Sequence, residues 1–215
     1  MNRVTVIDYG LGNLLSVEQA LRHCGADVVC TSSPELIEAA DFLVLPGVGA
    51  FGDGMKGLEL RGLLEPLLIA ARSGKPLLGI CLGMQLLFEN SSEFGLHAGL
   101  GLIPGIVRGI PPLSNKDGSR RRIPHIGWTG IIPPGNRCSW DEPLLDGLPQ
   151  GVSMYFVHSF MAHPTEESQL KAISNHDGVE VAAVVSRKNL TGCQFHPEKS
   201  GAAGLKLFEN FLRLG

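Results

Sequence analysis

The sequence has few cysteines, no long apolar run and no strong charge of either sign, and each of these shortages excludes a class of protein. The five cysteines among 215 residues are odd in number and irregularly spaced, which suits neither a disulfide framework nor a zinc site with paired ligands. No uncharged apolar stretch approaches about 18 residues, so we expect no membrane span. A formal net charge of -3 argues against a nucleic-acid binder, because such proteins usually carry concentrated positive charge.

The start of the chain and its overall composition indicate an ordinary globular protein. Residues 1–8 reach an acid at the eighth position without a long apolar region, so we expect no signal peptide and a cytoplasmic location. Hydrophobic residues make up 44% and charged residues 18%, which differs from the polar composition of a disordered chain. We see no internal repeat and no linker, and therefore expect one domain spanning residues 1–215.

The first half of the chain alternates strand-like with helix-like segments. Short β-branched or apolar runs predict strands, and apolar residues at helical spacing predict helices. The predicted strands are 4–8, 27–31, 42–45 and 77–80, and the predicted helices are 16–23, 34–40, 57–73 and 84–90. This alternation implies parallel pairing and a doubly wound sheet with helices on both faces.

The second half has a different pattern. Residues 99–149 are rich in Gly and Pro and lack long helical periodicity. Strands of a more antiparallel kind are predicted at 153–158, 170–174, 179–186 and 191–195, and a final helix at 202–214, capped by Ser200 or Gly201. The predicted fold class is α/β, with a mostly parallel sheet flanked by helices and an additional antiparallel portion in the C-terminal half.

Cys81 stands between two glycines where strand 77–80 should pass into a helix, in the run Gly79-Ile-Cys-Leu-Gly-Met-Gln85. Open parallel sheets bind ligands at the carboxyl ends of their strands. The G-x-C-x-G pattern is the thiol counterpart of the nucleophile elbow, where small neighbours permit a sharp turn. Backbone N–H groups at the helix start would favour a thiolate and could stabilise an oxyanion. The alternative is a packed cysteine in a tight turn.

A nucleophilic thiol needs a base, and the segment Gln194-Phe-His-Pro-Glu198 offers one beside a carboxylate. Pro197 disfavours helix at His196, and in an extended segment His196 and Glu198 would point to the same side. Glu198 could then orient the His196 ring and stabilise its charged form. Taken alone, such a segment at a strand end is more often a solvated turn.

The cysteine elbow and the histidine segment together resemble the class I (triad) glutamine amidotransferases, whose cysteine attacks the side-chain amide of glutamine and releases ammonia. Over nearly the whole chain, further segments are similar to the glutaminase subunits of imidazole glycerol phosphate synthases. These segments are 8–14 (DYGLGNL), 46–51 (PGVGAF), 124–128 (PHIGW), 155–160 (YFVHSF) and 195–200 (FHPEKS). The resemblance implies a flavodoxin-like class I amidotransferase fold.

The resemblance also implies a role for each matching residue. Cys81 would be the nucleophile that forms a γ-glutamyl thioester, His196 the general base and then the general acid, and Glu198 the group that orients His196. The oxyanion hole would be formed by Gly47, Val48, Gly49 and Leu82. The glutamine pocket would be formed by Gln85, Glu93, Val157, His158 and Ser159. The partner interface would include His125, Trp128 and Tyr155.

In the resembling enzymes the ammonia is consumed by a (β/α)8-barrel cyclase/synthase subunit, which forms a heterodimer with the glutaminase in histidine biosynthesis. Free ammonia is largely protonated at neutral pH, and an ammonium ion is no nucleophile, so delivery through a protein channel is expected. The resemblance implies no cofactor and no metal.

Two alternatives remain open on the sequence. A paralogous glutaminase subunit could supply ammonia to another synthase, such as a sugar-nucleotide amidotransferase for surface polysaccharide, with partner preference encoded in segments 114–122 and 137–140. A non-catalytic binding or scaffold protein could be built on the same fold. The presence of both Cys81 and His196 disfavours this second alternative.

Overall fold

The computed structural model describes residues 2–112 and 122–215, so segment 114–122, named above for partner preference, lies outside the described residues except for Arg122. The helices are α1 (Leu14–His23), α2 (Pro34–Glu38), α3 (Phe51–Leu60), α4 (Leu64–Arg72), α5 (Leu82–Leu86) and α6 (Gly201–Phe211), with 3-10 helices η1 (Pro143–Leu145), η2 (Glu167–Gln169) and η3 (Pro197–Lys199). The strands are β1 (Arg3–Ile7), β2 (Asp27–Thr31), β3 (Phe42–Leu45), β4 (Leu77–Ile80), β5 (Phe88–Ser91), β6 (His97–Ala98), β7 (Ile103–Gly109), β8 (His125–Ile132), β9 (Ser153–His158), β10 (Phe160–Pro164), β11 (Leu170–His176), β12 (Val179–Arg187) and β13 (Leu190–Cys193). Among these elements, no helix has the length and apolarity needed to cross a membrane.

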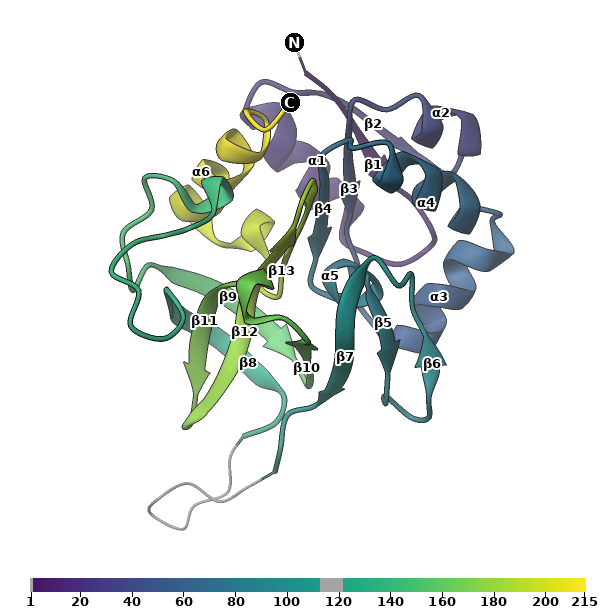
Figure 1. Cartoon of the computed structure of the whole chain (residues 1–215). Helices are drawn as coiled ribbons and strands as arrows, with labels where there is room; N and C mark the ends of the chain where they lie inside the picture. The colour runs from purple at the N-terminus through teal and green to yellow at the C-terminus, as the bar shows by residue number, and fades with distance from the viewer. Residues whose placement is uncertain (1, 113–121) are drawn as a thin grey trace.

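A 9-stranded sheet in the order β2-β1-β3-β4-β13-β12-β11-β8-β9 forms the centre of the molecule. Its pairs are parallel from β2 to β13 and antiparallel from β13 to β9. A 4-stranded sheet, β10-β7-β5-β6, lies beside it (Figure 1). The α/β class and the C-terminal antiparallel portion are confirmed, although the antiparallel portion is as extensive as the parallel one.

Helices cover both faces of the parallel strands. Helices α1 and α6 lie on one side, and α2, α3 and α4 lie on the other (Figure 1). Strands β3 and β4 are buried at every position, as expected when both faces of a parallel sheet are covered. Each face has its own apolar cluster, one against α1 and α6 and one against α2 to α4. The sheet is therefore a rigid base for the loops at its edge.

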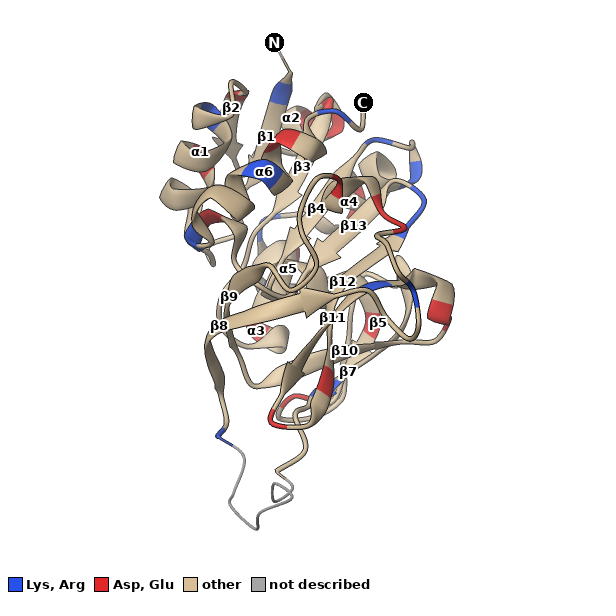
Figure 2. Cartoon of the chain, turned by 90° about the vertical axis from the view of Figure 1, so that its left-hand side faces the viewer, with Lys and Arg blue, Asp and Glu red and all other residues tan. Residues whose placement is uncertain are grey.

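The antiparallel end of the large sheet presents a face without charge. Strands β8 and β9 contain no Lys, Arg, Asp or Glu, and Figure 2 turns them toward the viewer. On this face Ile126 and Trp128 are 59% and 58% exposed. Exposed apolar side chains gathered on one face are typical of an interaction surface.

The helix predicted at 57–73 is wrong, because the chain forms two helices there. Helix α3 ends in a Schellman motif, in which Leu63 N–H donates to Leu58 O (2.9 Å) and Gly62 N–H donates to Glu59 O (2.9 Å). Gly62 has φ +66°, which only glycine adopts readily. Buried Leu58, Leu63 and Leu67 continue the apolar spacing across the break, so the periodicity concealed it.

The helix predicted at 84–90 is also wrong beyond residue 86. Helix α5 ends there and β5 begins at Phe88. The Leu86 carbonyl accepts from Leu100 N–H, and the Leu87 carbonyl accepts from Leu102 N–H (both 2.9 Å). Strand β5 then pairs in parallel with β7, which lies in the Gly- and Pro-rich stretch where no strand was predicted. Tertiary pairing has overridden local helical spacing.

We expect Gly204→Ala to destabilise the fold by about 1–3 kcal/mol, because a Cβ at Gly204 of α6 would lie 1.8 Å from the Pro197 carbonyl oxygen. Urea unfolding measures the effect. The control is Gly109→Ala in β7, where the nearest atom to the added Cβ is a ring carbon of Phe160 at 3.7 Å. Equal urea midpoints for the two variants would show that α6 does not pack closely against the Pro197 carbonyl of η3.

Candidate active site

The predicted nucleophile and base come together because their strands are neighbours. Strand β13 pairs in parallel with β4, with Cys193 opposite Ile80, so Cys81 and Gln194 leave the sheet side by side. Cys81 N–H donates to Cys193 O at 2.7 Å. The loops that follow β1 and β3 open at the same edge, since those strands are parallel to β4. The site therefore lies at the carboxyl edge of the parallel strands, as predicted.

Cys81 sits on a sharp turn with φ 54° and ψ -109°, which is strained for a residue with a side chain. Its two flanking glycines make this turn possible. A Cβ at Gly79 would lie 2.8 Å from Met84 N, and one at Gly83 would lie 1.7 Å from Leu45 O. The elbow geometry expected from the G-x-C-x-G pattern is present, and the flanking glycines are required by space.

The dipole argument for a thiolate is weaker than the sequence suggested. Helix α5 begins directly after Cys81 but has only 5 residues, so it carries little macrodipole. What remains are the individual backbone N–H groups of the turn, of which that of Leu82 is bonded to Gly47 O.

His196 and Glu198 are in contact and buried. Glu198 Oε1 lies 2.8 Å from His196 Nδ1, and the two side chains are 2% and 1% exposed. His196 is extended, with φ -101° and ψ 96°, as Pro197 predicted. Glu198, however, lies within η3, so the contact arises from a 3-10 turn and the predicted extended segment is wrong after His196.

The surroundings of His196 favour its charged form. Burial lowers the pKa of the His196 imidazole, but hydrogen bonds and charge from Cys81 and Glu198 outweigh it and raise the pKa to about 10. Within the part of the chain that the structure describes, His196 Nε2 is buried without a hydrogen-bond partner of good geometry. The Nε2 proton is thus available to a group that arrives at the cysteine.

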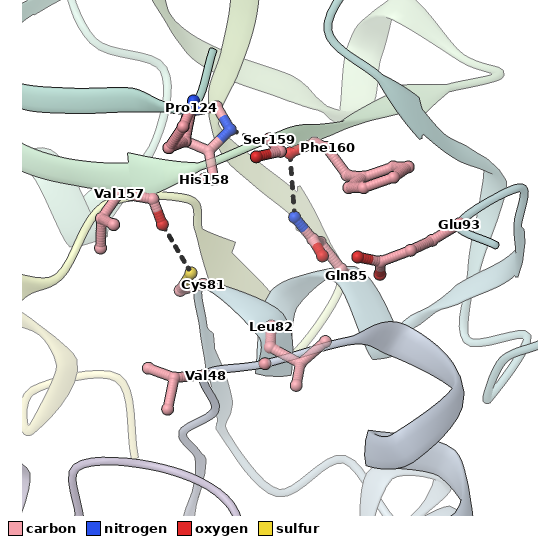
Figure 3. A pocket seen from close by; sticks show the side chains of 11 residues that line it. Val48, Cys81, Leu82, Gln85, Glu93, Pro124, Val157, His158, Ser159 and Phe160 are labelled. Carbon is pink, nitrogen blue, oxygen red and sulfur yellow. Dashed lines mark hydrogen bonds between the residues drawn. The ribbon is translucent and has the colours of Figure 1, made fainter.

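A pocket of about 340 Å³ opens over Cys81 (Figure 3). This size suits a small amino-acid substrate. Its lining residues are Val48, Gly49, Cys81, Leu82, Gln85, Glu93, Pro124, Val157, His158, Ser159 and Phe160. Every residue predicted for the glutamine pocket is in this lining, as are Val48, Gly49 and Leu82 of the predicted oxyanion hole. Pro124 and Phe160 were not predicted.

Two polar side chains of the pocket are already fixed by the protein. Gln85 Nε2 donates to Phe160 O at 3.0 Å, and Glu93 Oε2 accepts from Phe51 N–H at 2.7 Å, at the start of α3. Burial raises the pKa of the Glu93 carboxyl, although the Phe51 hydrogen bond opposes this. Both side chains point into the space beside Cys81 (Figure 3).

The predicted oxyanion donor Leu82 is occupied in this structure. Leu82 N–H donates to Gly47 O at 3.3 Å, so the 46–49 loop turns a carbonyl oxygen toward the site where an oxyanion would need N–H groups. Tyr9 fixes the start of this loop, because its buried hydroxyl donates to Pro46 O at 2.7 Å. A Cβ at Gly47 would lie 2.2 Å from that hydroxyl oxygen, which explains the glycine.

The three residues predicted at a partner interface do not share one environment. Trp128 is 58% exposed and its ring meets the half-buried Tyr155 ring edge-on at 6.0 Å. His125 is only 2% exposed. Its Nδ1 lies 3.0 Å from His158 Nε2, and its Nε2 lies 2.7 Å from Thr129 Oγ1. His125 therefore supports β8 and β9 from within, while Trp128 and Tyr155 face outward.

Sequence reasoning assigned no role to Gln194 or Tyr9, yet both are fully buried at the site. Gln194 Nε2 lies 3.6 Å from Cys81 Sγ. A usable signal was present for Gln194, because it is the first residue after β13 and β13 pairs with the strand that carries the cysteine. No comparable signal marked Tyr9.

Comparisons with known proteins agree with this geometry. The family model described as glutamine amidotransferase class-I matches residues 5–214. A curated relative from Legionella pneumophila (strain Lens), imidazole glycerol phosphate synthase subunit HisH 1, is 49% identical over 214 residues, which covers 100% of both chains. The HisH subunit of Geobacter metallireducens is 42% identical and covers 98% of both chains. The solved structure of PurLQS from Thermotoga maritima has a TM-score of 0.72 at 22% identity, covering 98% of this chain and 97% of that one, and shows a shared fold.

The buried histidines predict a pH dependence of stability. Burial and the neighbouring His176 lower the pKa of His125 to about 4, from 6.5 in the unfolded chain, and burial lowers that of His158 to about 3. The unfolded chain therefore takes up protons that the folded chain excludes, so stability present above pH 6.5 is lost as the pH falls toward 4. Between pH 7 and pH 4, we expect the free energy of unfolding of His125→Gln to fall by about 2 kcal/mol less than that of the wild type.

Urea unfolding at several pH values between 4 and 7 measures this slope for the wild type and His125→Gln. Leu15→Gln, at an exposed position of α1, removes and adds no titratable group; it is the control and should keep the wild-type slope. An unchanged slope in His125→Gln would mean that His125 is not held neutral by burial.

Proposed function

Because this chain belongs to the class I glutamine amidotransferase family, we propose that the pocket over Cys81 hydrolyses glutamine to glutamate and ammonia. One observation carries the proposal: the strained Cys81 elbow opens into a pocket, and the same cysteine favours the charged form of the buried His196, which is paired with Glu198. A scaffold protein would have no need of a strained cysteine beside a charged, buried histidine.

The proposed mechanism has two stages, formation of a thioester with release of ammonia and hydrolysis of that thioester. The Cys81 sulfur attacks the side-chain carbonyl carbon of glutamine, and the carbonyl oxygen becomes an oxyanion. His196, charged and held by Glu198, gives its Nε2 proton to the departing nitrogen, and ammonia leaves a γ-glutamyl thioester. Neutral His196 then takes a proton from water, whose oxygen attacks the thioester carbonyl. Glutamate is released and the Cys81–His196 pair is restored.

The oxyanion step requires a rearrangement of the 46–49 loop. The proposed oxyanion hole is closed while Leu82 N–H is bonded to Gly47 O. Rotation of the Gly47–Val48 peptide would release Leu82 N–H and turn Val48 N–H toward the substrate. Gly49, with φ +112°, gives the loop the freedom to do so. Such gating limits ammonia release to moments when an acceptor is ready.

The ammonia serves an imidazole glycerol phosphate synthase, and the chain is its glutaminase subunit in histidine biosynthesis. The full-length HisH relatives reported above support this function over a paralogous subunit for sugar-nucleotide amidation. The continuous 9-stranded sheet, which joins the first strands of the chain to the last, supports treatment of residues 1–215 as a single domain.

The partner that receives the ammonia is a (β/α)8-barrel synthase subunit, which binds the uncharged face of β8 and β9. Trp128 and Ile126 are the exposed apolar groups of this face, and the Lys199 ammonium lies 5.8 Å from the centre of the Tyr155 ring at its border. Val48, 40% exposed and also part of the pocket lining, connects the two sites. Contact at Val48 could therefore act directly on the oxyanion loop.

Cys81→Ala should lower glutamate release by at least about 10³-fold in the complex with the loaded barrel, because the variant lacks the sulfur that attacks the amide carbon and forms the thioester. Glutamate release is measured by a coupled assay with the barrel subunit and its nucleotide ligand. Glutamine binding and association with the barrel should be retained and serve as controls. Retained hydrolysis in this variant would refute the thioester mechanism.

Trp128→Ala should weaken binding of the barrel subunit by at least about 10-fold, because a large exposed aromatic at the centre of an apolar face is a typical hot spot. Isothermal titration calorimetry gives the dissociation constant. The control is Leu60→Ala, which removes an apolar side chain that is 73% exposed at the end of α3. Equal weakening by the two variants would place the interface elsewhere.

A further inference from the structure

Gln194 is a fully buried glutamine that touches the proposed nucleophile. It follows β13 directly and has 0% exposure. Its Nε2 lies 3.6 Å from Cys81 Sγ, and its Oε1 lies 3.0 Å from Gln85 Nε2. A distance of 3.6 Å is suitable for a hydrogen bond to sulfur, whose radius exceeds that of oxygen. A buried amide is costly unless its groups are paired, and here both ends have partners.

The network determines which end of each amide points to the sulfur. The Phe160 carbonyl can only accept, so the Gln85 end that faces it at 3.0 Å is the NH2 group. The same Gln85 NH2 group faces Gln194, which must present its oxygen there. The remaining end of Gln194, its NH2 group, is thereby directed at Cys81. The Phe160 carbonyl, which can only accept, thus determines the donor and acceptor ends of both amides.

We propose that Gln194 is a further catalytic residue, which donates an amide hydrogen bond to the Cys81 thiolate in the resting enzyme and again when the thiolate leaves the thioester. This inference rests on the proposed glutaminase function. A thiolate needs donors in a buried site, and hydrogen bonds to the charged form favour that form. Because α5 is short, its dipole cannot supply this stabilisation alone.

The other groups that act on Cys81 remain in place when Gln194 is changed. The titratable groups around the thiol and its histidine come from several elements: Tyr9 after β1, Cys193 in β13, His196 and Glu198 after it, and His158 in β9. None of these groups is hydrogen-bonded to the Gln194 side chain, whose partners among the described residues are Gln85 and Cys81. A change at Gln194 therefore reports on the amide itself.

The test is the pH profile of Cys81 alkylation by iodoacetamide, followed by mass spectrometry of the peptide that contains Cys81, in the full-length protein. In Gln194→Leu, which has a similar shape but no donor, the midpoint of the profile should move up by about one pH unit, the value of one lost charge-assisted hydrogen bond. In Gln194→Glu, a carboxylate in the same place should move the midpoint of the profile further up. Gln85 keeps its bond to Phe160 O in both variants.

Gln169→Leu is the matched control, since Gln169 is a glutamine of 3% exposure in η2, outside the pocket lining. It should keep the wild-type midpoint. A wild-type Cys81 that alkylates only at alkaline pH, like an ordinary thiol, would overturn the proposed function. A reactive wild-type Cys81 with an unchanged midpoint in both Gln194→Leu and Gln194→Glu would overturn the role of Gln194 alone. If Gln194→Leu does not fold, Gln194→Glu, which keeps the acceptor for Gln85, decides.

Discussion

The parallel pairing of β4 with β13 is the constraint on which the site depends. With Cys193 opposite Ile80, the residues that follow the two strands, Cys81 and Gln194, emerge together, and His196 lies two residues further on. A register shift of one residue would turn each side chain of β13 to the opposite face and move the base away from the nucleophile. The two strands are separated by more than a hundred residues of chain, so this contact exists only in the folded protein.

The strained turn at Cys81 limits which residues can surround it. The elbow leaves no space for side chains at Gly79 and Gly83, and it packs the start of α5 against β3. The buried polar groups nearby are held in pairs, Glu198 with His196 and Gln85 with Gln194. Such pairing fixes each group in one orientation, so little reorganisation is needed when charge develops during the reaction.

The occupied Leu82 donor connects the proposed chemistry to the surface proposed for the partner. The Gly47 carbonyl holds the Leu82 donor, while the adjacent Val48 is both exposed and part of the pocket lining. A partner that contacts Val48 acts directly on the Gly47–Val48 peptide, the group that must rotate. Fixation of Pro46 by Tyr9 confines the movement to the glycine-bordered peptides that follow. The loop is thus anchored at one end and free at the other.

The sequence by itself determined the parallel strands 27–31, 42–45 and 77–80, the cysteine elbow and most residues of the pocket lining, because these depend on local β-propensity, on glycine spacing and on motifs that resemble a known family. Only the tertiary structure decided the break between α3 and α4, the strand at Phe88, the interior position of His125 and the contact of Gln194 with the thiol. The strand at Phe88, the position of His125 and the contact of Gln194 arise from hydrogen bonds and packing between distant segments, whereas the break at Gly62 arises from a local backbone motif, and apolar periodicity carries no information about any of them. The Schellman motif at Gly62 shows the limit most clearly, because apolar spacing continues unbroken across a turn that only backbone hydrogen bonds reveal.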